Sequence, residues 1–86
     1  MIHATLQPVI MPDIGAGHWA VHVCSWLVGA GELVREGDRL VEVSLPGVTF
    51  DVPSPADGRL VTIDKATGAE VRPGDVLGKL SLSDDA

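Results

Sequence analysis

Apolar and polar residues alternate along most of this chain in short runs that glycine and proline interrupt. Residues 40–43 read Leu-Val-Glu-Val and residues 48–52 read Val-Thr-Phe-Asp-Val, the period of two expected of strands with one buried face. Between them, Pro46 and Gly47 predict a tight turn, because proline supplies the fixed φ of its first central position and glycine the positive φ of its second. The sequence therefore predicts a β-hairpin with its tip at these two residues.

Further short strands follow on both sides of this hairpin. Residues 19–28 are rich in β-branched and aromatic residues, and the parity of their apolar positions changes between Val23 and Trp26, which indicates a bulge or a strand buried on both faces. No segment keeps a helical period over ten residues or more. This pattern predicts an all-β fold, a flattened β-barrel or sandwich. The expected strands cover residues 9–12, 19–28, 33–34, 40–43, 48–52, 59–63 and 76–82.

A repeat with an offset of 37 residues divides the chain into two halves. Residues 31–40 align with residues 68–77, and glycine, valine, arginine, glycine, aspartate and leucine recur in place. Two units are too few for a solenoid, so we expect them to close on each other with quasi-two-fold symmetry, as two four-stranded sheets. The same offset maps the Pro46–Gly47 turn onto the C-terminal tail, which predicts that the hairpin tip and the chain ends lie at opposite ends of the molecule. Asp38 and Asp75, after matched glycines, are expected to hydrogen-bond their own turns.

Composition and charge limit the possible functions. The 86 residues suit one domain, with an apolar fraction of 45% and three aromatic residues in all. The formal net charge of −6 and the scattered basic residues argue against nucleic acid and membranes as partners. No apolar run approaches the roughly 20 residues of a membrane-spanning helix, and no secretory signal is visible. Together with a single cysteine, Cys24, these features predict a monomeric domain in the cytoplasm.

His18, His22 and Cys24 are the candidates for metal binding or nucleophilic chemistry. His22 and Cys24 would share one face of a strand, but a closed zinc site needs four ligands and no further cysteine or histidine completes it. Nothing anchors a base and an orienting acid around Cys24, so we expect no metal site, no catalytic residue and a buried or half-buried thiol. Trp26 is expected in the core. The core is also favoured for Trp19 over an exposed contact position, because so few aromatic residues are available.

Several motifs occur together in the order typical of one family. They are residues 11–15, 26–28, 34–38, 40–43, 52–58 and 71–77. In these motifs the chain resembles the biotinyl/lipoyl attachment domain family, and within it the lipoyl domains of 2-oxoacid dehydrogenase acyltransferases. The Met-Lys-Met tip of the biotinyl branch is absent. The resemblance implies a barrel-sandwich hybrid fold. It divides the chain into an N-terminal lead-in (1–8), a lipoyl-like domain (9–82) and an acidic tail or linker start (83–86).

The resemblance also implies a lysine at the hairpin tip, and this chain has none there. Members of the family carry an Asp-Lys turn whose lysine is bound to lipoate, a flexible arm that moves acyl groups between active sites. Those two positions are Pro46 and Gly47 here, and glycine has no amine to acylate. The neighbouring family loop usually has an acid that helps partners recognise the domain, and Ala16 stands there. Lys65 and Lys79 lie in the second half of the chain, away from any matching hairpin.

We therefore expect no lipoate or other cofactor on this chain and no enzymatic activity of its own. The expected role is an interaction or spacer module of, or derived from, the acyltransferase component of a 2-oxoacid dehydrogenase complex. Its partners would be the decarboxylase and the acyltransferase core. An alternative is a lipoyl-like structural domain of an adaptor protein, in which a long helical hairpin is inserted at the tip; the two-residue turn disfavours it. Candidate contact residues are Leu45, Pro46, Gly47, Val48, Ala16 and Trp19.

Overall fold

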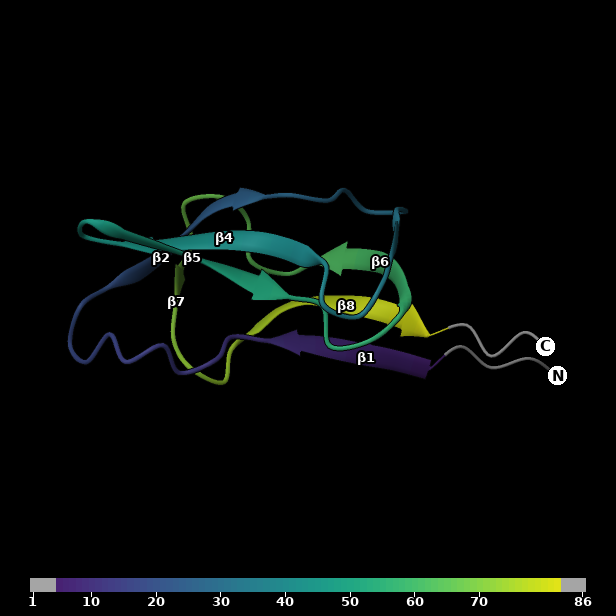
Figure 1. Ribbon diagram of the computed structural model, residues 1–86, viewed down its shortest axis with the longest axis horizontal. Coiled ribbons are helices and arrows are strands. Elements are labelled where there is room, and N and C mark those ends of the chain that lie inside the picture. The colour runs from purple at the N-terminus through teal and green to yellow at the C-terminus, as the bar shows by residue number, and fades with distance from the viewer. Residues whose placement is uncertain (1–4, 83–86) are drawn as a thin grey trace, which may run out of the picture.

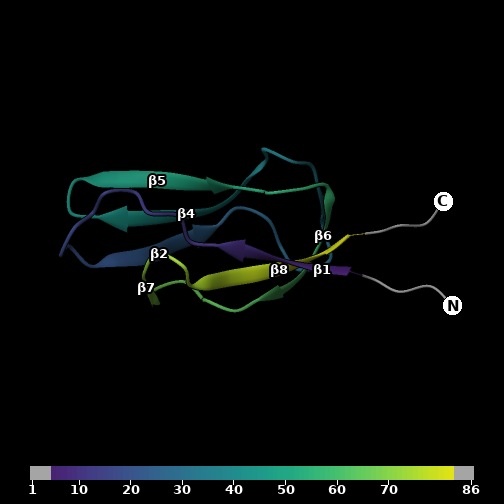
Figure 2. The same cartoon turned by 90° about the horizontal axis from the view of Figure 1, so that it is seen from below.

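The computed structural model describes residues 5–82, and every regular element in that range is a β-strand. The strands form two antiparallel sheets of four, in the orders β1-β8-β6-β3 and β5-β4-β2-β7 (Figures 1 and 2). The sheets face each other without closing into a barrel, so the predicted all-β, two-sheet fold is confirmed. Residues 5–82 contain no helix that could cross a membrane. The strands are β1 (Thr5–Ile10), β2 (Val21–Trp26), β3 (Leu33–Val34), β4 (Arg39–Leu45), β5 (Val48–Pro53), β6 (Gly58–Ile63), β7 (Glu70–Val71) and β8 (Val76–Leu82).

The observed strands differ most from the predicted ones at three places, β1, β2 and β7. β1 begins at Thr5 instead of residue 9, because residues 5–8 pair with β8. β2 is shorter than the predicted strand over residues 19–28, and it carries the expected bulge between Val23 and Ser25. β7 is missing from the predicted set, although the 37-residue offset maps the predicted strand over residues 33–34 onto it. The outer parts of the predicted lead-in and tail, residues 1–4 and 83–86, lie outside the described residues.

A quasi-two-fold axis relates the two halves at the offset that the repeat predicts. β2, β3 and β4 correspond to β6, β7 and β8, and the bulge in β2 recurs between Leu60 and Thr62 in β6. The matched aspartates bond their own turns as expected. Asp38 Oδ2 accepts the Arg35 N–H at 2.9 Å, and Asp75 Oδ2 accepts the equivalent N–H at 2.8 Å. The two halves are therefore equivalent in these strands and turns, and matched positions can be compared.

The hairpin tip and the chain ends are counterparts under this symmetry. Leu45 pairs with Val48 across the tip, and Leu82, the counterpart of Leu45, pairs with Thr5. The hairpin and the ends of the described chain lie at opposite ends of the molecule (Figure 1), as the repeat predicted. β1 accordingly takes the place in its sheet that β5 takes in the other.

Aliphatic side chains from both sheets fill the core, and one tryptophan bridges them. Trp26 is half-buried against this core, as expected, and its Nε1–H donates to the Lys65 carbonyl at 2.8 Å. A Cβ on Gly78 would lie 3.0 Å from Trp26 Cη2 and 2.6 Å from the Thr62 carbonyl oxygen. The indole therefore requires glycine below it. The buried core residues are Val9, Met11, Val21, Val23, Val34, Leu40, Val41, Val43, Val52, Leu60, Val71, Leu77 and Leu80.

Replacing Gly78 with alanine is expected to lower the free energy of unfolding by about 2 kcal/mol, because the added methyl group overpacks the space between the indole and β6. Urea unfolding monitored by tryptophan fluorescence measures the change. Gly29→Ala is the matched control, since its nearest neighbour, Glu32 Oε1, would lie 3.9 Å away. Equal stability of the two variants would contradict this account of the packing.

The ion pair between Lys79 and Asp64 makes a small, pH-dependent contribution to stability. Lys79 Nζ lies 2.6 Å from Asp64 Oδ2, and this hydrogen bond lowers the pKa of the carboxyl below its ordinary value. Asp64→Asn is expected to cost less than about 1 kcal/mol at neutral pH, because both side chains are partly exposed. A lowered folded pKa means that the contribution is complete above an unfolded pKa of about 4 and is lost as the pH falls through the folded value. Thermal unfolding curves of parent and variant should therefore converge in acid; a constant difference would contradict this.

Candidate functional site

The hairpin tip is a two-residue turn that displays no functional group. Leu45 and Val48 form the last pair of β4 and β5, and Pro46 and Gly47, both exposed, connect them. Gly47 has a φ of +78°, the value of the second central position of a type II turn. No atom lies within 4 Å of an ideal Cβ on Gly47. The scaffold would therefore leave room for a side chain here.

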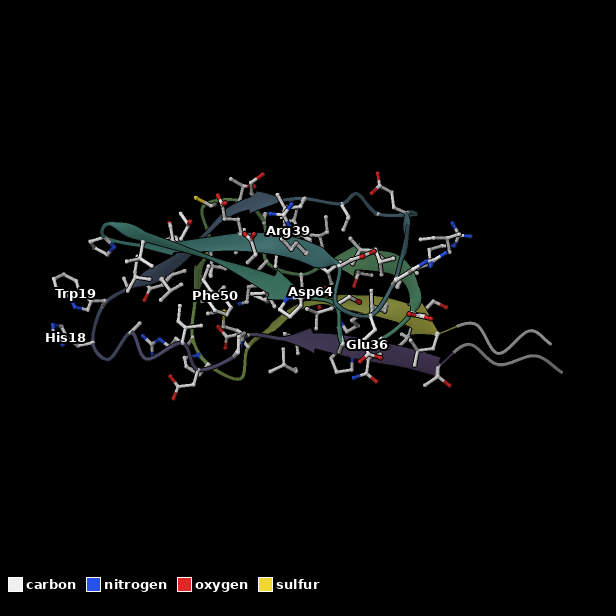
Figure 3. The ribbon with its side chains drawn as sticks, in the orientation of Figure 1. His18, Trp19, Glu36, Arg39, Phe50 and Asp64 are labelled. Carbon is white, nitrogen blue, oxygen red and sulfur yellow. The ribbon has the colours of Figure 1, made fainter. Side chains whose placement is uncertain are left out.

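A structured loop, residues 12–20, lies at the same end of the molecule as the tip (Figure 1). Asp13 Oδ1 accepts the Gly15 N–H at 2.9 Å, and the Ala16 carbonyl accepts the Trp19 N–H at 3.1 Å. Ala16 packs inward against the core, whereas Trp19 is 55% exposed and its ring stacks on His18 with centroids 5.2 Å apart. The two turns thus fix the loop and direct its aromatic pair outward (Figure 3).

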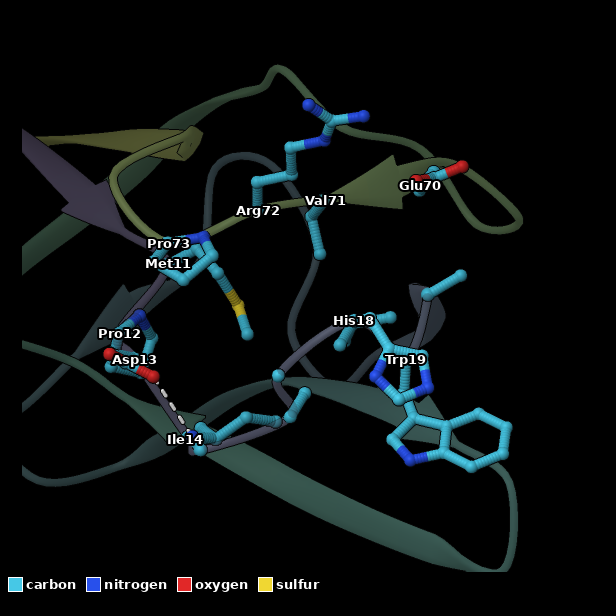
Figure 4. Close-up of a pocket in the computed structure, with 15 residues that line it drawn as sticks. Met11, Pro12, Asp13, Ile14, His18, Trp19, Glu70, Val71, Arg72 and Pro73 are labelled. Atoms are coloured by element: carbon cyan, nitrogen blue, oxygen red, sulfur yellow. Dashed lines mark hydrogen bonds between the residues drawn. The ribbon is translucent and has the colours of Figure 1, made fainter.

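This loop is the main departure from the two-fold symmetry. Residues 12–20 stand where the other half has residues 55–57. In that half the Glu36 N–H donates to Asp57 Oδ1 at 2.8 Å and closes the corner. The counterpart of Glu36 is Pro73, which has no N–H, and the counterpart of Asp57 is Ala20, which has no carboxylate. An open pocket of about 700 Å³ therefore remains between the loop and residues 70–73 (Figure 4).

Four of the predicted contact residues are exposed and two are partly covered. Pro46, Gly47, Val48 and Trp19 are exposed, while Leu45 and Ala16 are half-buried against the core. The expectation of a core position for Trp19 is wrong, because the loop carries it past the sheet edge. The structure also adds an apolar residue that the sequence analysis did not select. Phe50, on the hairpin, is 40% exposed, and only the strand order shows that β5 is an edge strand.

The side chains considered for metal binding do not converge. Cys24 is exposed, so the expectation of a buried or half-buried thiol is wrong. Cys24 is the extra residue of the β2 bulge, so it has no partner in β4. Its side chain therefore does not follow the alternation between core and solvent. His22 lies on the outer face of the sheet, opposite Ser44. Residues 5–82 contain no group of three histidine, cysteine or acidic side chains that could hold a metal ion.

The two lysines of the chain lie away from the hairpin tip. Lys79 sits in β8, in the other sheet, and is bound to Asp64. Lys65 follows β6 and is half-buried, and its carbonyl accepts the Trp26 indole N–H. Neither stands at the apex of a two-residue turn.

The family model described as "Biotin-requiring enzyme" matches residues 7–80. The chain belongs to the biotinyl/lipoyl attachment domain family. It is 35% identical over 79 residues, or 92% of its length, to the dihydrolipoyllysine-residue acetyltransferase component of the pyruvate dehydrogenase complex of Mycobacterium bovis. The component of the same name from Staphylococcus epidermidis is 36% identical over 76 residues, 86% of this chain. This lipoyl-type domain spans only 14% and 17% of those proteins.

A solved structure agrees with this assignment. The lipoyl domain of the 2-oxoglutarate dehydrogenase complex from Azotobacter vinelandii matches with a TM-score of 0.70 and 28% identity, over 88% of this chain and 96% of that one. The fold of the chain is therefore that of a lipoyl or biotinyl carrier domain, which lacks a catalytic site of its own. The chain is related to the acyltransferases of 2-oxoacid dehydrogenase complexes.

Replacing Gly47 with alanine is expected to cost about 1 kcal/mol of stability, because a Cβ disfavours the left-handed backbone region. No residue beyond the two chain neighbours lies within 4 Å of the Cβ, so the cost comes from the local backbone conformation alone. Gly47→Asn is the matched control and should cost less, since asparagine tolerates this region better. Urea unfolding of both variants measures the difference; equal costs for the two would contradict the assigned backbone conformation.

Proposed function

We propose that this lipoyl-type domain carries no lipoate and acts as an interaction or spacer module related to the acyltransferase component of a 2-oxoacid dehydrogenase complex. The observation that carries this proposal is Gly47 at the apex of the hairpin, where a carrier of this family needs an amine. Amide formation with lipoate requires a nucleophilic nitrogen on a side chain, and Pro46 and Gly47 have none. The fold is kept while the attachment chemistry is lost.

The other lysines do not replace the missing arm. Lys79 lies within β8 and forms an ion pair with Asp64. An enzyme that recognises a lysine at the tip of an exposed hairpin would not find that arrangement at Lys79. Lys65 lies beside the Trp26 indole, half-buried. We therefore infer that neither lysine is a lipoate acceptor.

The proposed partners follow from the names of the relatives. Those proteins are acetyltransferase components of pyruvate dehydrogenase complexes, so the decarboxylase and the acyltransferase core of such a complex are the proposed partners. Contacts would involve the tip, Pro46, Gly47 and Val48, with Trp19 from the neighbouring loop. The adaptor alternative is not favoured, because the pairing of Leu45 with Val48 leaves no insertion at the tip.

Intact mass after incubation with lipoate, ATP and a lipoate ligase tests the proposal. The natural chain is expected to keep its mass, because it has no acceptor at the tip. The double variant Pro46→Asp, Gly47→Lys is expected to gain one lipoyl group, since the backbone leaves space for a side chain there. Adding Lys65→Arg and Lys79→Arg to that variant should leave its modification unchanged.

Modification of the natural chain would overturn the absence of lipoate, and the two arginine variants would then locate the acceptor. If neither the natural chain nor the double variant reacts, the hairpin is not a ligase substrate even with its lysine. The inference that this domain differs from a lipoyl carrier only by its missing acceptor would then be wrong.

A further inference from the structure

Only two edge strands in the described part of the chain are long enough to accept another strand. The sheet orders place β1 and β3 at the edges of one sheet and β5 and β7 at the edges of the other. β3 and β7 have two residues each, whereas β1 and β5 have six. A free edge presents unpaired N–H and C=O groups, which proteins often block with proline, a charge or a covering segment.

Proline blocks β1, and its counterpart position in β5 is open. Pro8 lies opposite Lys79, and the counterpart of that pair is Asp51 opposite Glu42. Pro8 has no N–H, so the middle of the β1 edge cannot donate to an added strand. Asp51 keeps its N–H. The fold therefore contains two equivalent edge strands, of which β1 is blocked by proline and β5 is not.

The register of the hairpin determines which groups of β5 face outward. Leu45 and Val48 flank a two-residue turn and form its closing hydrogen-bonded pair. Antiparallel pairs alternate between bonded and non-bonded, so Phe50 is bonded to β4 while Thr49 and Asp51 are not. The N–H and C=O groups of Thr49 and Asp51 therefore point away from β4, toward the open edge.

Apolar side chains flank this edge without being needed for the fold. Val48 is 55% exposed and Phe50 is 40% exposed, on the inner side of the hairpin. Their counterparts in β1 are Thr5 and Gln7, which shows that the fold accepts polar residues at these positions. The hairpin thus offers an apolar strip alongside free backbone groups.

The outer face of the same sheet is acidic. Glu42 and Asp51 are cross-strand neighbours there, and Glu70 lies on the same face opposite His22. Arg39 Nη1 lies 3.3 Å from Asp51 Oδ2, the one ion pair that this face contains among residues 5–82. The whole chain also has a net charge of −6. Basic side chains on the outer face of an added strand would therefore be attracted to this sheet.

We propose that the free edge of β5 is a strand-addition site for an extended segment of a partner protein, with branched apolar residues at alternate positions and lysine or arginine between them. Its backbone would bond to Thr49 and Asp51, and its apolar side chains would lie on Val48 and Phe50. Its basic side chains would face Asp51 and, one strand further in, Glu42. The choice of a protein partner rests on the proposed interaction role. The lipoylation test measures mass and the peptide test measures binding, so failure of one proposal can be distinguished from failure of the other.

Amide hydrogen exchange tests the geometry first. In the free protein the Thr49 and Asp51 amides are expected to exchange fast, while the Phe50 amide is protected by β4. A short capped peptide that alternates valine and lysine is the probe. Its addition should protect the Thr49 and Asp51 amides, and slow exchange of these amides in the free protein would overturn the proposal.

Fluorescence anisotropy of the labelled peptide then measures binding to three forms of the chain. Asp51→Pro removes the N–H at the position equivalent to Pro8 in β1. It is expected to weaken peptide binding at least about tenfold, because one buried backbone hydrogen bond is lost. Asp51→Ala is the matched control. It loses the same contact with Arg39 but keeps the N–H, and should bind within about threefold of the parent. Thr49→Pro serves if Asp51→Pro does not fold.

Three results of the binding measurements would overturn the proposal. They are equal binding by the folded proline variant, absence of binding to the parent at millimolar peptide, and equal binding of a peptide that alternates valine and glutamate. Self-association of the parent that Asp51→Pro abolishes, with no binding of the peptide, would identify a second copy of this chain as the occupant and would also overturn it.

Discussion

The structure depends on the exchange of two very short strands between the halves of the chain. β3 leaves the first half to bond with β6, where the Gly31 N–H donates to the Leu60 carbonyl at 2.7 Å. β7 repeats this on β2, where the Gly68 N–H donates to the Val23 carbonyl at 2.8 Å. Each half therefore completes the sheet of the other, and neither can bury its apolar face alone. This interlock lets a short, mainly aliphatic chain form one shared core.

Most of this architecture could be predicted from the sequence, because its signals are local. Alternation marks the longer strands, and the glycine–aspartate repeat marks the symmetry. The failures are tertiary. Trp19 and Cys24 are ordinary core candidates by residue type, yet a loop path and a bulge place them in solvent. The tip at Gly47 could be placed in advance, since proline–glycine has few alternatives as a turn. The exposure of Phe50 could not, because strand order decides which hairpin strand lies at an edge.

Two positions where the two-fold symmetry breaks lie at the hairpin end of the molecule (Figure 1). The loop of residues 12–20 is longer than its counterpart, and the corner that Asp57 closes in one half is open at Ala20 in the other. Core packing does not require the longer loop or the open corner, because the equivalent positions of the other half have a short loop and a closed corner. The internal repeat thus acts as a built-in comparison, which separates residues that the fold requires from residues that it only tolerates.

The equivalence of the Leu45–Val48 and Leu82–Thr5 pairs has a consequence for how the strands can be connected. Thr5 pairs with Leu82 as Val48 pairs with Leu45, so the start of β1 lies beside the end of β8 as the start of β5 lies beside the end of β4. Joining the ends and opening the chain at Pro46–Gly47 would give a circular permutant with the same strand neighbours. The tip that a carrier would modify and the Thr5–Leu82 pair therefore occupy equivalent corners of the two sheets.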